Sequence, residues 1–216
     1  MPLLFTQNSP AIGIWKIEES SQEMLESIRK NENYPRDIDH DVNNIKLEKR
    51  KQEWLAVRLL LSHIDSPASY IDYLESGAPF LRNNLYNISI SHTTGFAAMI
   101  LSNKEKPGID IEYHSGRAYK LREKFLGNIE MEMFDLLNDT SHYNIETLAT
   151  LCWCAKETAF KALMQTEVDF IEHLHILPFT LSDKGEFSLK ETKSPLQEVF
   201  NIKYHITEDY IITWKE

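Results

Sequence analysis

The stretch that most constrains this 216-residue chain is Gly108-Ile109-Asp110-Ile111-Glu112. Isoleucine and acidic residues alternate with a period of two, which is typical of a β-strand. In such a strand Asp110 and Glu112 point to one side and the two isoleucines to the other. Two carboxylates on a rigid strand favour a site for a hard divalent cation, which prefers oxygen ligands. An exposed strand with a solvated acidic face is the alternative interpretation.

A predicted helix over residues 145–164 adds a third carboxylate. Within it Glu157 and Lys161 are four residues apart, so they share one helix face. One interpretation is an ordinary helical salt bridge, which contributes little to stability. The other is that Glu157 joins Asp110 and Glu112 as a ligand of Mg²⁺, with Lys161 beside a reacting phosphate.

Other helices and strands are predicted without a regular alternation along the chain. Strands are expected at 11–17, 70–74, 87–92, 96–101, 175–181, 186–189, 199–205 and 210–214, and helices at 20–30, 41–64, 119–126 and 130–137. This order favours an α+β fold over a doubly wound parallel sheet.

Composition argues against several classes of function. A net charge of -10 disfavours a general nucleic-acid binder, because neutralising phosphates needs a basic surface. No apolar run approaches the ~20 residues that span a membrane, and no signal peptide is recognised. Two closely spaced cysteines, Cys152 and Cys154, fit a reducing setting, so we expect a cytoplasmic protein without a membrane partner.

Basic residues gather at Lys49-Arg50-Lys51, in the charged first part of the predicted helix over 41–64. A solvated helix face is one interpretation of this cluster. The other is a phosphate anchor, because Arg binds phosphate through two parallel hydrogen bonds and Lys supplies a point charge. Ser91 and His92, at the end of a predicted strand, are a second candidate phosphate-binding pair.

Together these stretches resemble the Sfp-type 4'-phosphopantetheinyl transferase family. The resemblance lies in five ordered blocks: KRKQEWLAVR at 49–58, GAPFL at 77–81, ISISH at 88–92, GIDIE at 108–112 and WCAKETAFK at 153–161. The last two blocks are the most specific. The resemblance implies two similar α+β lobes packed as a pseudo-dimer, with an N-terminal lobe over 1–104 and a C-terminal lobe over 105–216.

The resemblance also implies an enzyme that moves 4'-phosphopantetheine from coenzyme A to a serine of an apo acyl or peptidyl carrier protein, releasing adenosine 3',5'-bisphosphate. By matching position, Asp110, Glu112 and Glu157 would hold Mg²⁺ on the pyrophosphate. Glu157 would also help to deprotonate the carrier serine, and Lys161 would assist the leaving phosphate. Contacts to coenzyme A are expected from Lys49, Arg50, Ser91, His92 and Lys156. A monomer that uses neither nucleic acid nor a membrane is expected.

Two positions depart from the family pattern, since Ala78 stands where a lysine is usual and Val57 where a glycine is common. Neither change touches the expected metal ligands. The main alternative is a catalytically silent module that binds coenzyme A or a carrier protein. A metal-dependent nuclease is a weaker alternative, because the Glu-x-x-x-Lys spacing and the negative net charge both disfavour it.

The resemblance places the carrier-protein contact on the second lobe. There Lys120, Arg122 and Lys124, with Phe125 and Leu126, form a candidate patch of basic and apolar residues. A solvated amphipathic helix is the alternative interpretation of this segment.

Overall fold

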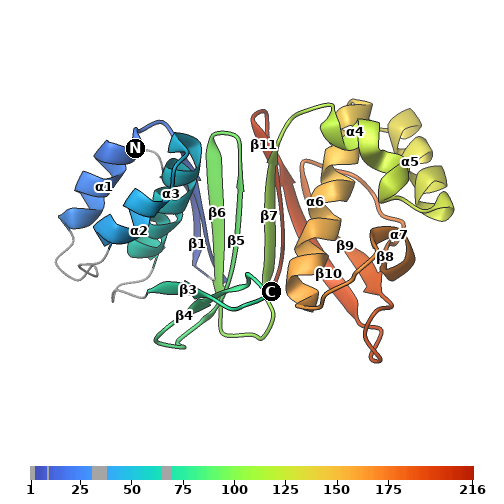
Figure 1. Ribbon diagram of the computed structural model, residues 1–216. Coiled ribbons are helices and arrows are strands. Elements are labelled where there is room, and N and C mark those ends of the chain that lie inside the picture. The colour runs from blue at the N-terminus through green and yellow to red at the C-terminus, as the bar shows by residue number, and fades with distance from the viewer. Residues whose placement is uncertain (1–2, 9, 31–37, 65–69) are drawn as a thin grey trace. The chain divides into compact units, whose positions relative to one another are not determined.

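The computed structural model describes residues 3–8, 10–30, 38–64 and 70–216, which form two compact units, Met1–Glu105 and Lys106–Glu216 (Figure 1). Each unit combines a β-sheet with packed helices, which confirms the α+β class. The predicted similarity of the two lobes and their pseudo-dimer arrangement stay predictions. In the part of the chain that the structure describes, no helix is long and apolar enough to cross a membrane.

The first unit is built on a four-stranded antiparallel sheet in the order β1-β2-β6-β5. Its elements are β1 (Leu3–Asn8), β2 (Ala11–Lys16), α1 (Ser21–Arg29), α2 (Ile38–Asn44), α3 (Glu48–Ile64), β3 (Ile71–Tyr73), β4 (Pro79–Leu81), β5 (Asn87–Thr93) and β6 (Phe96–Ser102). Leu55 and Leu60 of α3 are fully buried in one core with Met99 of β6 and Ile28 of α1. Burying each leucine stabilises the unit by ~1.5–3 kcal/mol.

Local sequence explains where the first helices begin and end. Ser20 caps α1, because its hydroxyl accepts from the backbone N–H of Glu23 while the Glu23 carboxylate accepts from the backbone N–H of Ser20. The prediction of one helix over 41–64 was wrong, since α2 and α3 are separate helices with a break at 45–47. Two asparagines end α2, and asparagine favours turns over helix interiors.

The second unit is built on a five-stranded antiparallel sheet in the order β7-β11-β10-β9-β8. Its elements are β7 (Gly108–Tyr113), α4 (Arg117–Leu121), the 3₁₀ helix η1 (Arg122–Lys124), α5 (Asn128–Thr140), α6 (Ile145–Leu163), α7 (Phe170–His173), β8 (Leu174–Ile176), β9 (Lys184–Glu191), β10 (Val199–Ile206) and β11 (Tyr210–Lys215). The predicted strand at 175–181 is shorter than expected, because Pro178 lacks the N–H that a sheet ladder needs.

The core of this unit lies between the sheet and α6, which runs along one sheet face (Figure 1). Burial alternates along β10, so that Ile202 and Tyr204 face the core while Lys203 is exposed. Small residues of α6, Ala155 and Ala159, are fully buried in the same cluster and let the helix approach the strands closely. This close contact between α6 and the sheet positions the candidate site.

Candidate functional site

Two carboxylates lie on the face of β7 that α6 covers. Asp110 is opposite Thr213 of β11, and Glu112 is opposite Ile211. Opposite residues of an antiparallel pair share a face, and Thr213 contacts α6 through the hydroxyl of Thr158, at 2.6 Å between the two Oγ1 atoms. The predicted alternation on β7 is therefore confirmed, and its acidic face is turned towards the helix rather than left in solvent.

A glycine sets how closely α6 approaches β7. A Cβ atom on Gly108 would lie 2.2 Å from the backbone carbonyl oxygen of Thr158, which no real side chain tolerates. Thr213 adds a second fixed contact, because its hydroxyl donates to the carbonyl of Cys154 at 2.9 Å. The strand and the helix thus hold a defined separation, and side chains reaching from one to the other meet at short distances.

Lys161 of α6 reaches across to β7. Its ammonium donates to the carboxylate of Asp110 at 2.8 Å and to the carbonyl of Ile109 at 3.0 Å. Asp110 is almost fully buried, whereas the Lys161 side chain keeps 25% of its surface exposed. Lys161 therefore holds a positive charge at the edge of the site, with one side against Asp110 and the other open to solvent.

The surroundings of Glu157 perturb its titration. The pKa of its carboxyl is raised to about 7, chiefly by burial and then by the negative charge of Asp110, while Lys161 lowers it and Glu112 adds a smaller increase. These influences show that the three carboxylates are near enough to interact. A carboxyl group that titrates near neutral pH can both accept and release a proton under physiological conditions.

Glu112 is held by an aromatic group. The indole Nε1 of Trp153 donates to its carboxylate at 3.3 Å. The indole itself is packed against two rings, with centroid distances of 5.2 Å to Phe125 and 5.6 Å to Phe170. Trp153 thus acts as a donor to Glu112 and does not merely fill the core.

In the first unit, a buried carboxylate organises the predicted phosphate anchors. Glu53 Oε2 accepts from Arg50 at 2.8 Å, and Glu53 Oε1 lies 3.9 Å from the Lys49 ammonium. Arg50 also donates to His92 Nε2 at 3.0 Å. Because arginine only donates, Nε2 must accept, which places the imidazole proton on Nδ1, 3.6 Å from Glu53. The structure therefore brings Lys49, Arg50 and His92 together.

Ser91 does not join this cluster through its side chain. Side chains alternate along β5, so Ser91 and His92 point to opposite faces of the sheet, and their burial differs accordingly. The prediction that these neighbours act as a pair on one phosphate is not supported by this placement. A contact between Ser91 and coenzyme A stays an expectation from the resemblance alone.

Comparison with known proteins decides the family. A family model described as the 4'-phosphopantetheinyl transferase superfamily matches residues 106–215, which is just over half of the chain. The chain belongs to this superfamily. The matched range contains the whole second unit except its last residue, and with it Asp110, Glu112, Glu157 and Lys161.

Two curated proteins are similar to this phosphopantetheinyl transferase superfamily member over a shorter range. They are the 4'-phosphopantetheinyl transferases AcpT of Escherichia coli strain K12 and of Escherichia coli O157:H7, each 40% identical over 70 residues. The match covers 32% of this chain and 36% of each relative, so the chain spans only about a third of the length of these relatives.

The donor set fits a hard metal ion, which the superfamily implies. Asp110, Glu112 and Glu157 offer only carboxylate oxygens. The pKa of Glu157 is raised by burial first and then by the charges of Asp110 and Glu112, and a divalent cation would relieve that repulsion. As the side chains stand, no group of three or more Asp, Glu, His or Cys residues within the described ranges is arranged around a common point for a metal. The Lys161 ammonium is the cation beside Asp110.

One predicted contact residue lies away from any phosphate site. Lys156 is fully buried, and its ammonium donates to the Glu130 carboxylate at 2.6 Å and to the carbonyls of Phe125 and Phe170 at 2.6 and 2.8 Å. Three short hydrogen bonds use all three of its donors. The prediction that Lys156 contacts coenzyme A is therefore corrected, and Lys156 has a structural role.

The candidate carrier patch is also changed. Phe125 and Leu126 are buried in the core of the second unit, so they offer no apolar surface to a partner. Arg122 donates to the carbonyl of Tyr119 and lies over the Tyr119 ring. Lys120 and Lys124 are exposed, so they are the two charges of the patch that are most available to a partner.

Sequence reasoning missed two buried acids, Glu53 and Glu130. Glu53 follows Lys49 and Arg50 by four and three residues, a spacing that places all three on one helix face and could have identified it. Glu130 had a weaker signal, because its partner Lys156 is 26 residues away in the chain. Burial, which the sequence does not show, separates these two acids from the many solvated ones.

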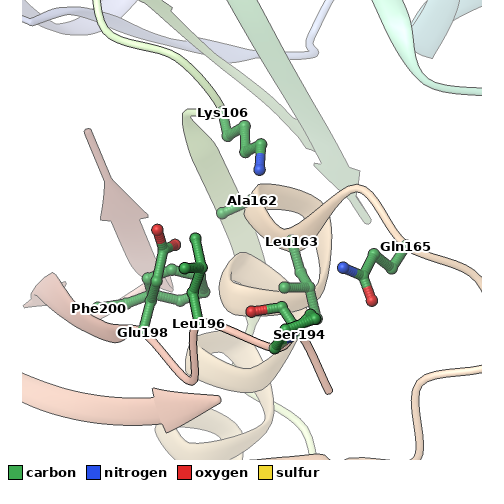
Figure 2. Close-up of a pocket in the computed structure, with 9 residues that line it drawn as sticks. Lys106, Ala162, Leu163, Gln165, Ser194, Leu196, Glu198 and Phe200 are labelled. Carbon is green, nitrogen blue, oxygen red and sulfur yellow. The ribbon is translucent and has the colours of Figure 1, made fainter. Parts of the chain in front are cut away.

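A pocket of about 220 Å³ lies at the C-terminal end of α6 (Figure 2). Its lining residues are Lys106, Ala162, Leu163, Gln165, Ser194, Pro195, Leu196, Glu198 and Phe200. The buried carboxylate of Glu191 shapes its outer wall by accepting from the backbone N–H groups of Ser194 and Glu198. None of the predicted site residues lines this pocket, so it is separate from the candidate site of Asp110, Glu157 and Lys161.

Proposed function

We propose that this protein transfers the 4'-phosphopantetheine group of coenzyme A to a serine of an apo acyl or peptidyl carrier protein, with Mg²⁺ as the metal and adenosine 3',5'-bisphosphate as the other product. Membership of the superfamily supports this activity. The observation that carries it is the meeting of Asp110, Glu157 and Lys161 between β7 and α6, with a carboxyl group that titrates near neutral pH.

The reaction forms one bond and breaks another. The serine oxygen attacks the phosphorus that carries pantetheine, and the bond from that phosphorus to the bridging pyrophosphate oxygen breaks. Glu157, with its pKa of about 7, is suited to take the serine proton. Lys161, already charged at the edge of the site, is suited to neutralise the oxygen that leaves on adenosine bisphosphate.

Mg²⁺ held by Asp110, Glu112 and Glu157 would supply charge neutralisation on the pyrophosphate. The chain's own residues would prepare for it, since the Trp153 indole orients Glu112 and the Lys161 ammonium donates to the buried Asp110 carboxylate. An oxygen-only donor set suits Mg²⁺, which usually keeps places for water and substrate phosphate.

In the proposed function, the cations of the first unit bind the phosphates of coenzyme A. Arg50 and Lys49 are each partly exposed while Glu53 beneath them is buried, so their charged ends are available to a ligand. His92 accepts from Arg50 through Nε2, and its Nδ1 lies 3.6 Å from Glu53, so the imidazole is fixed beside the two cations. Glu53 fixes the positions of all three without touching the ligand itself.

The test is intact-mass analysis of several apo carrier proteins incubated with this protein, coenzyme A and Mg²⁺. Wild type is expected to add one phosphopantetheine group, and Glu157→Gln to add none over the same time. Glu146→Gln, in the exposed first turn of the same helix, is the matched control and should behave as wild type. Binding of coenzyme A without transfer to any carrier would instead support the silent binding module.

A further inference from the structure

A buried ion pair in the second unit joins Lys156, the residue before Glu157 on α6, to Glu130 of α5. Lys156 is fully buried and Glu130 is 4% exposed, and their charged atoms are 2.6 Å apart. Isolated charges are very costly to bury, so such a pair persists only where other hydrogen bonds complete it. Here both partners are fully engaged, which makes the pair a fixed point in the core.

The pair ties together four segments that are separate in the chain. The Lys156 ammonium donates to the backbone carbonyls of Phe125, after η1, and Phe170, at the start of α7. The Glu130 carboxylate accepts from the backbone N–H groups of Gly127, at 3.0 Å, and Ile176, at 2.8 Å. The backbone at Phe125 and at Phe170 is therefore held against the middle of α6.

The two segments held in this way carry the rings that surround Trp153. Phe125 contacts the indole edge-on with an interplanar angle of 70°, and Phe170 packs on it at 39°. Trp153 precedes Lys156 by three residues on α6, so the ion pair and the indole lie on neighbouring turns of one helix face. Moving either phenylalanine backbone would release the indole.

We infer that the Lys156–Glu130 pair is a positioning device for the metal ligand Glu112. It fixes the carbonyls of Phe125 and Phe170, their rings fix the Trp153 indole, and the indole N–H donates to the Glu112 carboxylate at 3.3 Å. This inference deepens the proposed function and rests on it for the role of Glu112 as a metal ligand. Lys156 and Glu130 touch neither metal nor substrate, so they are positioning residues.

A purely structural role would predict something different. If the pair only stabilised the core, its removal would lower the free energy of unfolding without a specific effect on Trp153. The double variant Lys156→Met/Glu130→Gln removes both charges at nearly constant volume, and replacing both partners is tolerated far better than breaking a pair. The matched control is Glu191→Gln, a fully buried carboxylate of the same unit that organises the loop at 191–198.

The direct readout is the indole ¹⁵N–¹H signal of Trp153, assigned by its loss in Trp153→Phe. In the double variant this signal should shift, and its exchange with solvent should become at least tenfold faster. Glu191→Gln should leave both unchanged. An unchanged Trp153 signal in a folded double variant would overturn the inference, whether or not the protein proves to be a transferase.

Phe125→Leu leaves the ion pair intact and should shift the signal in the same direction. This variant replaces the double variant in the test if the double variant does not fold.

The second readout is the Mg²⁺ concentration that gives half-maximal transfer. The double variant should raise it about fivefold or more, with the KM for coenzyme A within twofold of wild type. In a Trp153→Phe background the double variant should add no further increase, because the effect passes through the indole. Additive effects would show that the ion pair acts by another route. If wild type transfers nothing, the proposed function fails, and the indole readout still decides the inference.

Discussion

Two lysines of α6, Lys156 and Lys161, are five residues apart and each pairs with an acid, yet their surroundings differ. Lys156 is completely buried, with all three donors used inside the protein. Lys161 pairs with Asp110 but keeps a quarter of its side-chain surface exposed. The Lys156 ammonium holds segments of backbone in place, while the Lys161 ammonium remains accessible to a ligand. The difference shows that the role of a lysine in this motif depends on how deeply its ammonium group is buried and on which partners bind it.

The largest effect is expected from breaking the buried pair. Lys156→Met leaves the Glu130 charge alone in the core and should lower the free energy of unfolding by about 3–5 kcal/mol. Adding Glu130→Gln should restore at least half of that loss. Urea unfolding followed by tryptophan fluorescence measures both. Equal stability of the single and double variants would mean that the backbone N–H groups of Gly127 and Ile176 satisfy Glu130 without the lysine.

Removing the second lysine should affect catalysis more than stability. Lys161→Met is expected to lower kcat for phosphopantetheine transfer by ~10²–10³-fold, as the loss of one charge-stabilising donor usually does. Its loss of stability should be smaller than that of Lys156→Met, because the ammonium is partly solvated. Lys203→Met, on the exposed face of β10, is the control. A Lys161→Met enzyme with wild-type kcat would remove Lys161 from the mechanism.

A third buried acid extends the comparison to the first unit. Glu53→Gln should raise the KM for coenzyme A about tenfold, or about 1.4 kcal/mol, while kcat stays near wild type. The reason is that Glu53 orients the cations Lys49 and Arg50 but does not meet the reacting atoms. Glu26→Gln, exposed on α1, should change neither constant. A lowered kcat with unchanged KM would contradict this role.

An effect of a different kind is expected from pH. The folded-state pKa of Glu157 is raised to about 7 from 4.5, so the folded protein binds this proton more tightly than the unfolded chain does. In metal-free buffer the contribution of Glu157 to stability is therefore full below pH 4.5 and falls as pH rises towards 7. Thermal unfolding of wild type beside Glu157→Gln measures it. The variant should lack this decline, and parallel curves would show that Glu157 titrates normally.

Much of the fold follows from short-range patterns. The alternation at 108–112 and the serine cap before α1 are visible in the sequence, and both are found in the structure. The break at 45–47 was missed because apolar and charged residues continue through it, and only two asparagines mark it. Local preference is a weak guide where packing decides, as it does where α2 and α3 meet the core.

The candidate site was predictable in its residue types but not in its contacts. Lys156 and Lys161 stand in the same motif, and no spacing rule separates a buried lysine from one at a site edge. Ser91 and His92 are neighbours in the sequence, and the strand turns them to opposite faces. These distinctions depend on burial and on partners distant in the chain, such as Glu130 for Lys156, which only the folded structure supplies.

Gly108 carries a practical consequence for anyone who wishes to move this site into another scaffold. Because its missing side chain is what admits the Thr158 carbonyl, the strand and the helix form a single transferable module. If only the acidic strand were grafted onto a host whose helix lies farther from it, the contact between Lys161 and Asp110 would not form. The smallest unit that preserves this geometry is therefore a strand and a helix that meet at a glycine, and not a set of acidic side chains.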